Sequence, residues 1–288
     1  MLTAADALRV ERRRRPRRSL RQQYDEYAFE RIEAYKNSLP REQLMRLGDE
    51  ANAGMCDGSE GQFVLTEVLM VDLVDELIKR RLKLKSFRQW ARQIRALRDA
   101  QREPTHWGLE PDGPIVGLLR RIESGDRAVV VGPAGEGVAC LLAAHDMGVT
   151  FMAGDLGSVN RLESRFESEA LASAFEAFVV DFSLWRPTLE DGSALAVLDC
   201  GALSTLEPAV REELVRDIQC HTCPAGVHVL LPGTGRYSPD TLLHLYEGWV
   251  REEVGRPQRR GARSRGIVLA RHRATAGAPT ARERASTS

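Results

Sequence analysis

The feature that most constrains the fold is a series of short, continuously apolar runs in the second half of the chain. The runs are rich in β-branched residues, and stretches with helical periodicity separate them. Runs that are apolar throughout indicate strands buried on both faces, and strands joined by helices indicate right-handed crossovers in a mostly parallel sheet. The sequence therefore predicts an α/β domain. The six runs cover residues 128–131, 149–152, 177–180, 194–198, 227–231 and 266–270.

A glycine turn follows the first of these runs and leads directly into a helical stretch. It reads GPAGEG over residues 132–137, and such a turn lets a ligand approach backbone amides at a helix N-terminus. Asp155 follows the second run, where a carboxylate can accept both hydroxyls of a ribose. Asp181 and Phe182 follow the third run, at a position that suits an adenine amino group and a ring over the base. Together these residues predict a nucleoside ligand at the carboxyl ends of the strands.

The motifs absent from the sequence and the charge of the glycine turn narrow the choice of nucleoside ligand. None of the five tyrosines is followed, four positions on, by the lysine that short-chain dehydrogenases need, and the pattern GxxxxGK[ST] for phosphate binding is absent. Pyrophosphate favours a positively charged loop, whereas this one carries Glu136 and no cation. A carboxylate suits a ligand with an ammonium and a sulfonium group, so S-adenosylmethionine is favoured over a dinucleotide.

Three segments near the C-terminus carry further motifs. They are QCHTCPAGVHV (219–229), LHLYEGWVREE (243–253) and GIVLARHR (266–273). They are similar to the turn before the fifth strand, the final helix with the strand after it, and the last, antiparallel strand of class I methyltransferases, most closely the tellurite-resistance type. The resemblance covers residues 115–273. It implies a Rossmann-like sheet, S-adenosylmethionine as cofactor and methyl transfer to a small-molecule substrate. The residues expected around the cofactor are Gly132, Ala134, Gly135, Glu136, Asp155, Asp181, Phe182 and Cys200.

The glycine turn departs from the pattern of that family. Val130 stands where the family has an acidic residue, the later glycines are displaced by one position, and Asp155 comes late after its strand. We hypothesise that Glu136 replaces the missing acid. The alternative is a catalytically silent protein of the same fold, which binds a ligand or a protein partner in regulation or assembly. No catalytic residue is assigned, and Asp199 after the fourth run is either a base or a helix cap.

The N-terminal part of the chain has a different organisation. Apolar residues at helical spacing predict a helical domain over residues 20–103, and Pro and Gly over residues 104–114 predict a linker. His106 and Trp107 in that linker either anchor it or cover a substrate. We expect the Arg-rich residues 1–19 and the small, polar residues 274–288 to be disordered.

Charge and cysteine content restrict the partners. Residues 116–254 hold 10 Lys and Arg against 21 Asp and Glu, while residues 255–288 hold 9 against 1. An acidic body is a poor nucleic-acid surface, so a nucleic acid is a disfavoured partner. It remains an alternative as the substrate of a modifying enzyme, held by the Arg-rich arm and the N-terminal helices. Those helices are also a candidate surface for a protein partner. No apolar run approaches the ~18 residues of a membrane span. Five scattered cysteines argue against disulfides, and we expect a cytoplasmic protein.

One further motif contains residue types that can bind zinc. Cys220 and Cys223, with His221 and His228 close by, form at most half of the ligand set of a zinc site. We expect a structural loop there and no metal.

Overall fold

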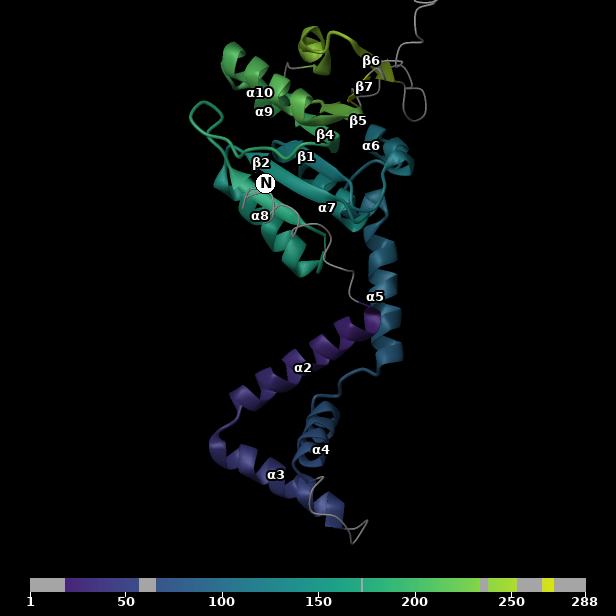
Figure 1. Ribbon diagram of the computed structural model, residues 1–288, viewed down its shortest axis with the longest axis vertical. Helices are drawn as coiled ribbons and strands as arrows, with labels where there is room; N and C mark the ends of the chain where they lie inside the picture. Colours follow the sequence, from purple (N-terminus) through teal and green to yellow (C-terminus); the bar gives the residue numbers. More distant parts are fainter. Residues whose placement is uncertain (1–18, 57–65, 172, 234–237, 253–265, 272–288) are drawn as a thin grey trace, which may run out of the picture. The chain divides into compact units, whose positions relative to one another are not determined.

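The computed structural model describes all residues except 1–18, 57–65, 172, 234–237, 253–265 and 272–288. The expected disordered tail, and the expected arm apart from Ser19, lie outside the described residues. The chain divides into two compact units, Met1–Leu97 and Arg98–Ser288 (Figure 1). The division falls within a helix, a few residues before the domain boundary at residue 103 that the sequence indicates.

The first unit consists of helices. They are α2 (Leu20–Ser38), α3 (Arg41–Cys56), α4 (Thr66–Arg81) and most of α5 (Phe87–Gln101). Helix α2 begins with a capping box, in which the Ser19 hydroxyl accepts the Gln22 amide at 3.2 Å and the Gln22 side chain accepts the Ser19 amide at 2.8 Å. Its core is small and takes one fully buried side chain from each of the first three helices: Ile32, Leu47 and Ile78.

The second unit is built on a seven-stranded sheet with the strand order β3-β2-β1-β4-β5-β7-β6. Strands β1 to β5 pair in parallel where they are neighbours, and β7 runs antiparallel to both β5 and β6. This is a Rossmann-like, mostly parallel sheet with an antiparallel last strand, so the α/β fold class predicted from the sequence is confirmed. The strands are β1 (Arg127–Val131), β2 (Gly148–Ala153), β3 (Phe175–Val179), β4 (Ser193–Asp199), β5 (Thr222–Leu231), β6 (Trp249–Glu252) and β7 (Ile267–Arg271).

Helices cover both faces of this sheet. Helices α7 (Glu136–Ala144) and α8 (Leu156–Ser168) pack on one face, and α9 (Cys200–Ser204) and α10 (Pro208–His221) pack on the other (Figure 1). Strand β1 serves two cores at once, because Val130 belongs to the first and its neighbours Val129 and Val131 belong to the second. The remaining short helices are η1 (Pro104–Trp107), α6 (Pro114–Leu118), η2 (Leu119–Arg121), η3 (Pro133–Gly135) and η4 (Pro239–Leu245).

The segment around η1 is anchored on the first face. Trp107 is 3% exposed, donates its indole N–H to the Gln101 carbonyl and has the Arg165 guanidinium over its ring at 5.0 Å. Of the two alternatives for Trp107, the structure therefore shows the anchor. Within the described residues, none of the helices has both the length and the apolar character that crossing a membrane requires.

Candidate functional site

Strand register brings the expected ligand residues to one edge of the sheet. Ala153 of β2 pairs with Val179 of β3, and Asp155 and Asp181 each lie two residues further along the chain. The glycine turn lies beside them, because the Gly132 amide donates to the carbonyl of Met152, near the end of β2, at 2.8 Å. The turn after β1 and the acids after β2 and β3 are thus neighbours at the carboxyl edge, where sheets of this kind bind ligands.

The two glycines that begin and end η3 are required by packing within the protein. Gly132 has φ of +91°, and a Cβ placed on it would stand 2.5 Å from the Cβ of Asp199. A Cβ on Gly135 would stand 2.3 Å from Cγ1 of Val130, which is itself fully buried in the first core. The valine at position 130 therefore fills the space under the turn, and a carboxylate in its place would be buried without solvent.

Asp199 connects the glycine turn to the start of α9. Its carboxylate is 4% exposed and caps α9, because Oδ1 accepts the amides of Gly201 at 2.8 Å and Ala202 at 3.3 Å. Its Oδ2 accepts the amide of Ala134, in the middle of the turn, at 3.0 Å. From the sequence, Asp199 could be either a catalytic base or a helix cap. The structure shows that it caps α9 and also holds the glycine turn through the Ala134 amide.

Glu136, the hypothesised replacement for the acid at position 130, points toward α8. Its Oε1 pairs with Arg161 at 2.8 Å, and the same guanidinium donates to the hydroxyl of Ser158 at 2.8 Å. The carboxylate thus already has a cationic partner within the protein. An ammonium ligand at this position would have to share Glu136 with Arg161.

The acids after β2 and β3 are exposed to solvent. Asp155 caps α8 by accepting the Ser158 amide at 2.7 Å, and hydrogen bonds from Ser158 lower the pKa of this carboxyl group. Asp181 accepts the Ser183 amide at 3.0 Å with one of its oxygens. Both side chains are held by a local turn, and Asp155 is ionised at neutral pH.

Two other expected residues lie inside the protein. Phe182 is 8% exposed and Cys200 is 2% exposed, and both belong to the second core. Burial raises the pKa of the Cys200 thiol to about 12, so this thiol is protonated and unreactive at neutral pH. Both side chains therefore present little surface to a ligand.

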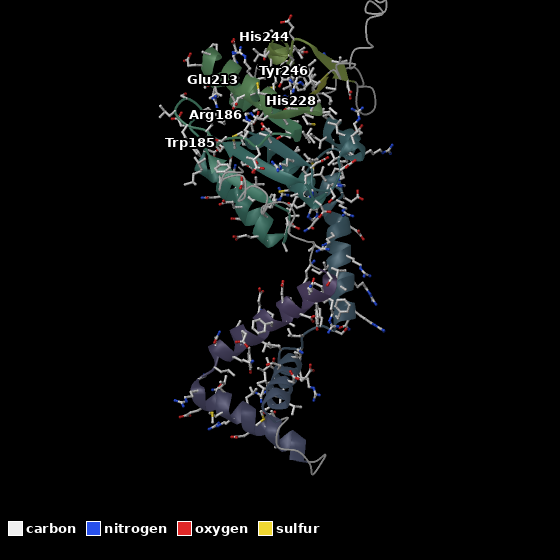
Figure 2. The ribbon with its side chains drawn as sticks, viewed as in Figure 1. Trp185, Arg186, Glu213, His228, His244 and Tyr246 are labelled. Atoms are coloured by element: carbon white, nitrogen blue, oxygen red, sulfur yellow. The ribbon has the colours of Figure 1, made fainter. Side chains whose placement is uncertain are left out.

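Three exposed apolar side chains flank the exposed acids. From the sequence, the segment 185–187 is a candidate wall for the adenine end, so Trp185 is a candidate for the site, whereas Leu156 and Leu184 are not. Leu156 follows Asp155 and is 60% exposed, and Leu184 and Trp185 follow Asp181 at 85% and 55%. Trp185 is labelled in Figure 2. Trp185 contacts Phe178 edge to face at 6.3 Å. The signal for them was present in the sequence, since apolar residues directly after a strand-end acid stand outside any buried run.

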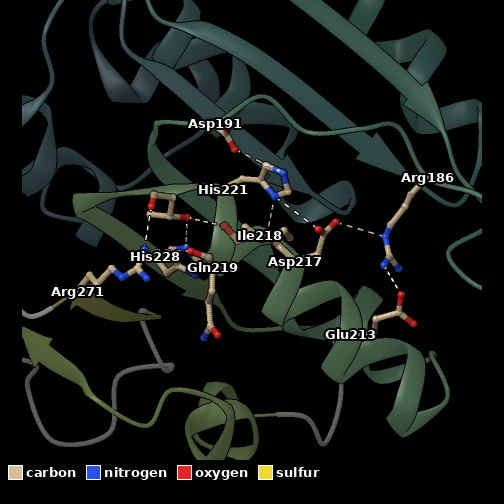
Figure 3. A network of polar contacts seen from close by, with 10 residues as sticks. Arg186, Asp191, Glu213, Asp217, Ile218, Gln219, His221, His228 and Arg271 are labelled. Carbon is tan, nitrogen blue, oxygen red and sulfur yellow. Dashed lines mark hydrogen bonds and ion pairs between the residues drawn. The ribbon is translucent and has the colours of Figure 1, made fainter.

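The motif with Cys220, Cys223, His221 and His228 spans the end of α10 and the strand β5, where the sequence predicts a loop. Cys220 is exposed, Cys223 and His221 are half-buried, and only His228 belongs to a buried polar cluster. His228 is fully buried; one ring nitrogen lies 2.8 Å from the Thr222 hydroxyl and the other 3.0 Å from the Tyr246 hydroxyl. The Thr222 hydroxyl donates to the Ile218 carbonyl, so it accepts from His228 (Figure 3). Tyr246 therefore donates to the opposite ring nitrogen. Burial lowers the pKa of His228 to about 3. Among the residues that the structure describes, no three potential ligands gather to hold a metal ion.

A network of ion pairs fixes the loop after β3 on α10. Arg186 pairs with Glu213 at 2.5 Å and with Asp217 at 3.4 Å, and His221 lies 3.5 Å from Asp217 and 3.7 Å from Asp191 (Figure 3). These contacts attach the loop to α10 at Arg186, the residue directly after Trp185.

Comparison with known proteins finds likeness in three-dimensional structure alone. No family model matches the chain, and no curated protein matches it. A TehB-like SAM-dependent methyltransferase from Corynebacterium glutamicum is 18% identical, with a TM-score of 0.42, over 64% of this chain and 95% of that one. The N-methyltransferase NodS from Bradyrhizobium japonicum, in complex with S-adenosylhomocysteine, is 17% identical, with a TM-score of 0.39, over 55% and 87%. A methyltransferase from Streptococcus mutans, also in complex with S-adenosylhomocysteine, is 10% identical, with a TM-score of 0.42, over 54% and 94%. Likeness at this level concerns the fold and says nothing of activity.

Proposed function

We propose that the α/β unit binds S-adenosylmethionine at the carboxyl edge of its sheet and transfers the methyl group to a small-molecule acceptor. The observation that carries the proposal is the pair of exposed carboxylates, Asp155 and Asp181, on neighbouring strand ends beside the glycine turn. An adenosyl group needs an acceptor for its ribose hydroxyls and one for its adenine amino group at such neighbouring positions. Asp155 would take the first role and Asp181 the second.

The residues present fit the adenosyl half of this cofactor better than its methionyl half. The acids for the adenosyl half are exposed, and Asp155 is held in its ionised form. In the methionyl half, Gly132, Ala134 and Gly135 would provide the turn, and Glu136 would face the ammonium while it keeps its contact with Arg161. Phe182 and Cys200 would support the site from the core.

The cofactor supplies a methyl group that its sulfonium already activates, so the chain needs to align the acceptor and exclude water more than to move a proton. The exposed side chains of Leu156, Leu184 and Trp185 offer apolar surface for both tasks. A thiolate is not available from Cys200, and the three amides that Asp199 accepts occupy its carboxylate. We therefore assign no catalytic base.

A second candidate is a catalytically silent protein of the same fold, and one pair of contacts favours it. The Ala134 amide is already bonded to Asp199, and Glu136 is already paired with Arg161. Both groups would be needed at the methionyl half of the cofactor. If the Ala134 amide and Glu136 keep these contacts within the protein, the site would hold an adenosyl ligand without aligning the methyl group of the cofactor for transfer.

Calorimetric titration with S-adenosylmethionine and S-adenosylhomocysteine tests the proposal. The decisive variant is Asp155→Asn, because asparagine keeps the cap of α8 and removes only the charge. A charged hydrogen bond contributes about 1.5–3 kcal/mol, so we expect the variant to bind both ligands roughly 10- to 100-fold more weakly. Glu163→Gln removes an exposed carboxylate from the same helix and serves as the matched control, with unchanged affinity.

Transfer of a tritiated methyl group then separates the two candidates. Label that enters the small-molecule fraction of a cell extract, and no longer does so with Asp155→Asn, supports the enzyme. Binding of both ligands without any transfer supports the silent protein. If the native chain binds neither ligand, the proposal is wrong and only the fold remains.

A further inference from the structure

The first unit carries a dense basic segment from the end of α4 into α5. Between Glu76 and Leu97 the chain holds eight Lys and Arg residues and no Asp or Glu. Two of the eight pair with acids of the unit, because Lys79 pairs with Glu76 at 2.8 Å and Arg81 pairs with Glu50. The eight residues are Lys79, Arg80, Arg81, Lys83, Lys85, Arg88, Arg92 and Arg95.

Three of these residues form a row on α5 that we call the basic stripe: Arg88, Arg92 and Arg95. They follow one another at spacings of four and three residues, so they lie on one face of the helix. All three side chains are exposed, and within the described part of the chain none of them has an ion-pair or hydrogen-bond partner. Seven residues of helix at 1.5 Å per residue place the stripe over about 10 Å.

The opposite face of α5 is occupied by protein. Trp90 is 9% exposed and contacts the rings of Tyr24 and Tyr27 of α2, with centroid distances of 5.5 and 6.1 Å. Phe87 contacts the Tyr24 ring at 5.6 Å, and Ala91 is 4% exposed. The apolar side of this amphipathic helix is therefore already used in packing.

The stripe does not help the helix that carries it. Arg88 stands in the first turn of α5, which has no acidic residue, and the positive end of the helix dipole disfavours a cation there. Like charges three or four residues apart each cost about 0.2–0.5 kcal/mol, and the stripe contains two such neighbouring pairs. Because no described residue of the unit pairs with the stripe to offset these costs, the arrangement points to an anion from outside.

We infer that the basic stripe binds the phosphates of a nucleic acid without sequence specificity. Along one strand of a duplex, phosphates follow each other at about 3.4 Å of axis, so a row of about 10 Å spans roughly three of them. Guanidinium groups bind phosphate oxygens in a bidentate manner. An anionic lipid surface is disfavoured, because a helix that lies on a membrane inserts its apolar face, and here that face packs on Tyr24 and Tyr27.

This inference refines one sequence expectation and does not depend on the proposed methyl transfer. From the sequence, nucleic acid is a disfavoured partner held by the Arg-rich arm and the N-terminal helices, whereas the stripe is a defined set of residues on a described, packed helix. It concerns the first unit alone. Loss of cofactor binding by the α/β unit would leave it standing.

Salt-dependent binding by the full chain tests the inference. Fluorescence anisotropy would follow a labelled single-stranded RNA and a duplex DNA of about 20 nucleotides per strand, from about 50 to 200 mM salt. The test variant replaces Arg88, Arg92 and Arg95 together by Gln. Three lost phosphate contacts are expected to reduce the slope of log K against log salt by about 2 for RNA and about 2.7 for the duplex.

A matched variant replaces Arg31, Arg41 and Arg46 by Gln, which removes the same charge from exposed positions of α2 and α3 in the same unit. We expect its slope to equal that of the native chain. Circular dichroism should show full helicity for both variants. Binding by the Arg-rich arm is common to all three proteins and cancels in the comparison.

Three results would overturn the inference. The first is that the native protein binds neither RNA nor DNA. The second is that the two triple variants reduce the salt slope by the same amount, and the third is that the protein binds vesicles with anionic lipid but no nucleic acid.

Discussion

The buried imidazole of His228 makes the stability of β5 depend on pH in a way that can be worked out from the structure. Burial lowers the pKa of His228 from the ordinary value of 6.5 to about 3 in the folded chain. Between these two values the unfolded chain binds a proton that the folded chain does not. The free energy of unfolding therefore falls as the pH falls below 6.5, and this loss is complete only near pH 3.

The size of the effect follows from the same two values. At pH 5, which is 1.5 units below the unfolded pKa, the loss is ~2 kcal/mol, since one pKa unit corresponds to about 1.4 kcal/mol. The carboxylate of Asp155, whose pKa is lowered from 3.8, begins to lose its contribution only near that value. His145 is the one other described histidine with a resolved shift, since burial lowers its pKa too.

Amide hydrogen exchange of β5 peptides measures this locally, without requiring that both units unfold together. We expect the opening free energy of residues 222–231 to drop by ~2 kcal/mol from pH 8 to pH 5 in the native chain. The variant His228→Gln cannot titrate in this range and should lose that drop, whatever its absolute stability. The variant His145→Gln is the control and should retain it. A pH dependence that survives in His228→Gln would refute the reasoning.

Three further changes test the packing around the glycine turn and the loop after β3. Gly132→Ala should cost the α/β unit roughly 1–3 kcal/mol, seen as a lower urea midpoint, because the residue has φ of +91° and its Cβ would meet that of Asp199 at 2.5 Å. Asp199→Asn should cost about 1–3 kcal/mol in the same assay, since the carboxamide can satisfy the cap of α9 only by turning its nitrogen toward the Ala134 amide. Arg186→Ala should cost no more than about 1 kcal/mol, because its partner Glu213 is largely exposed, and a much larger loss would contradict the account.

Most of the sheet could be predicted from the sequence because its central strands, such as β1 and β4, are buried on both faces. Each of the six apolar runs forms a strand in the structure, and their continuous, β-branched pattern indicates strands and not amphipathic helices. The seventh strand, β6, carries no such run: it lies at the edge of the sheet, and two of its four residues, Val250 and Arg251, are exposed. The other edge strand, β3, could be predicted because its sequence does contain an apolar run.

The candidate site could be predicted only in part, for a related reason. The places of Asp155 and Asp181 follow from where their strands end. The contacts of Glu136 with Arg161, and of Ala134 with Asp199, join residues 25 and 65 positions apart, and no local pattern encodes them. Phe182 illustrates the same limit, since an aromatic residue after a strand can cover a ligand or join the core, and the structure shows it in the core.

The glycine turn is weaker support for a ligand than its sequence suggests. Gly132 and Gly135 are both needed to avoid collisions with protein atoms, so their presence would follow from packing even in a chain that binds nothing. The same does not hold for Asp155, because asparagine or serine would cap α8 as well as aspartate does. Asp181 likewise supports only a short turn with its one hydrogen bond to Ser183. The negative charge of these two exposed side chains is the property that folding does not explain. The effect of Asp155→Asn on cofactor affinity therefore decides between a binding site and a fold that has kept only its architecture.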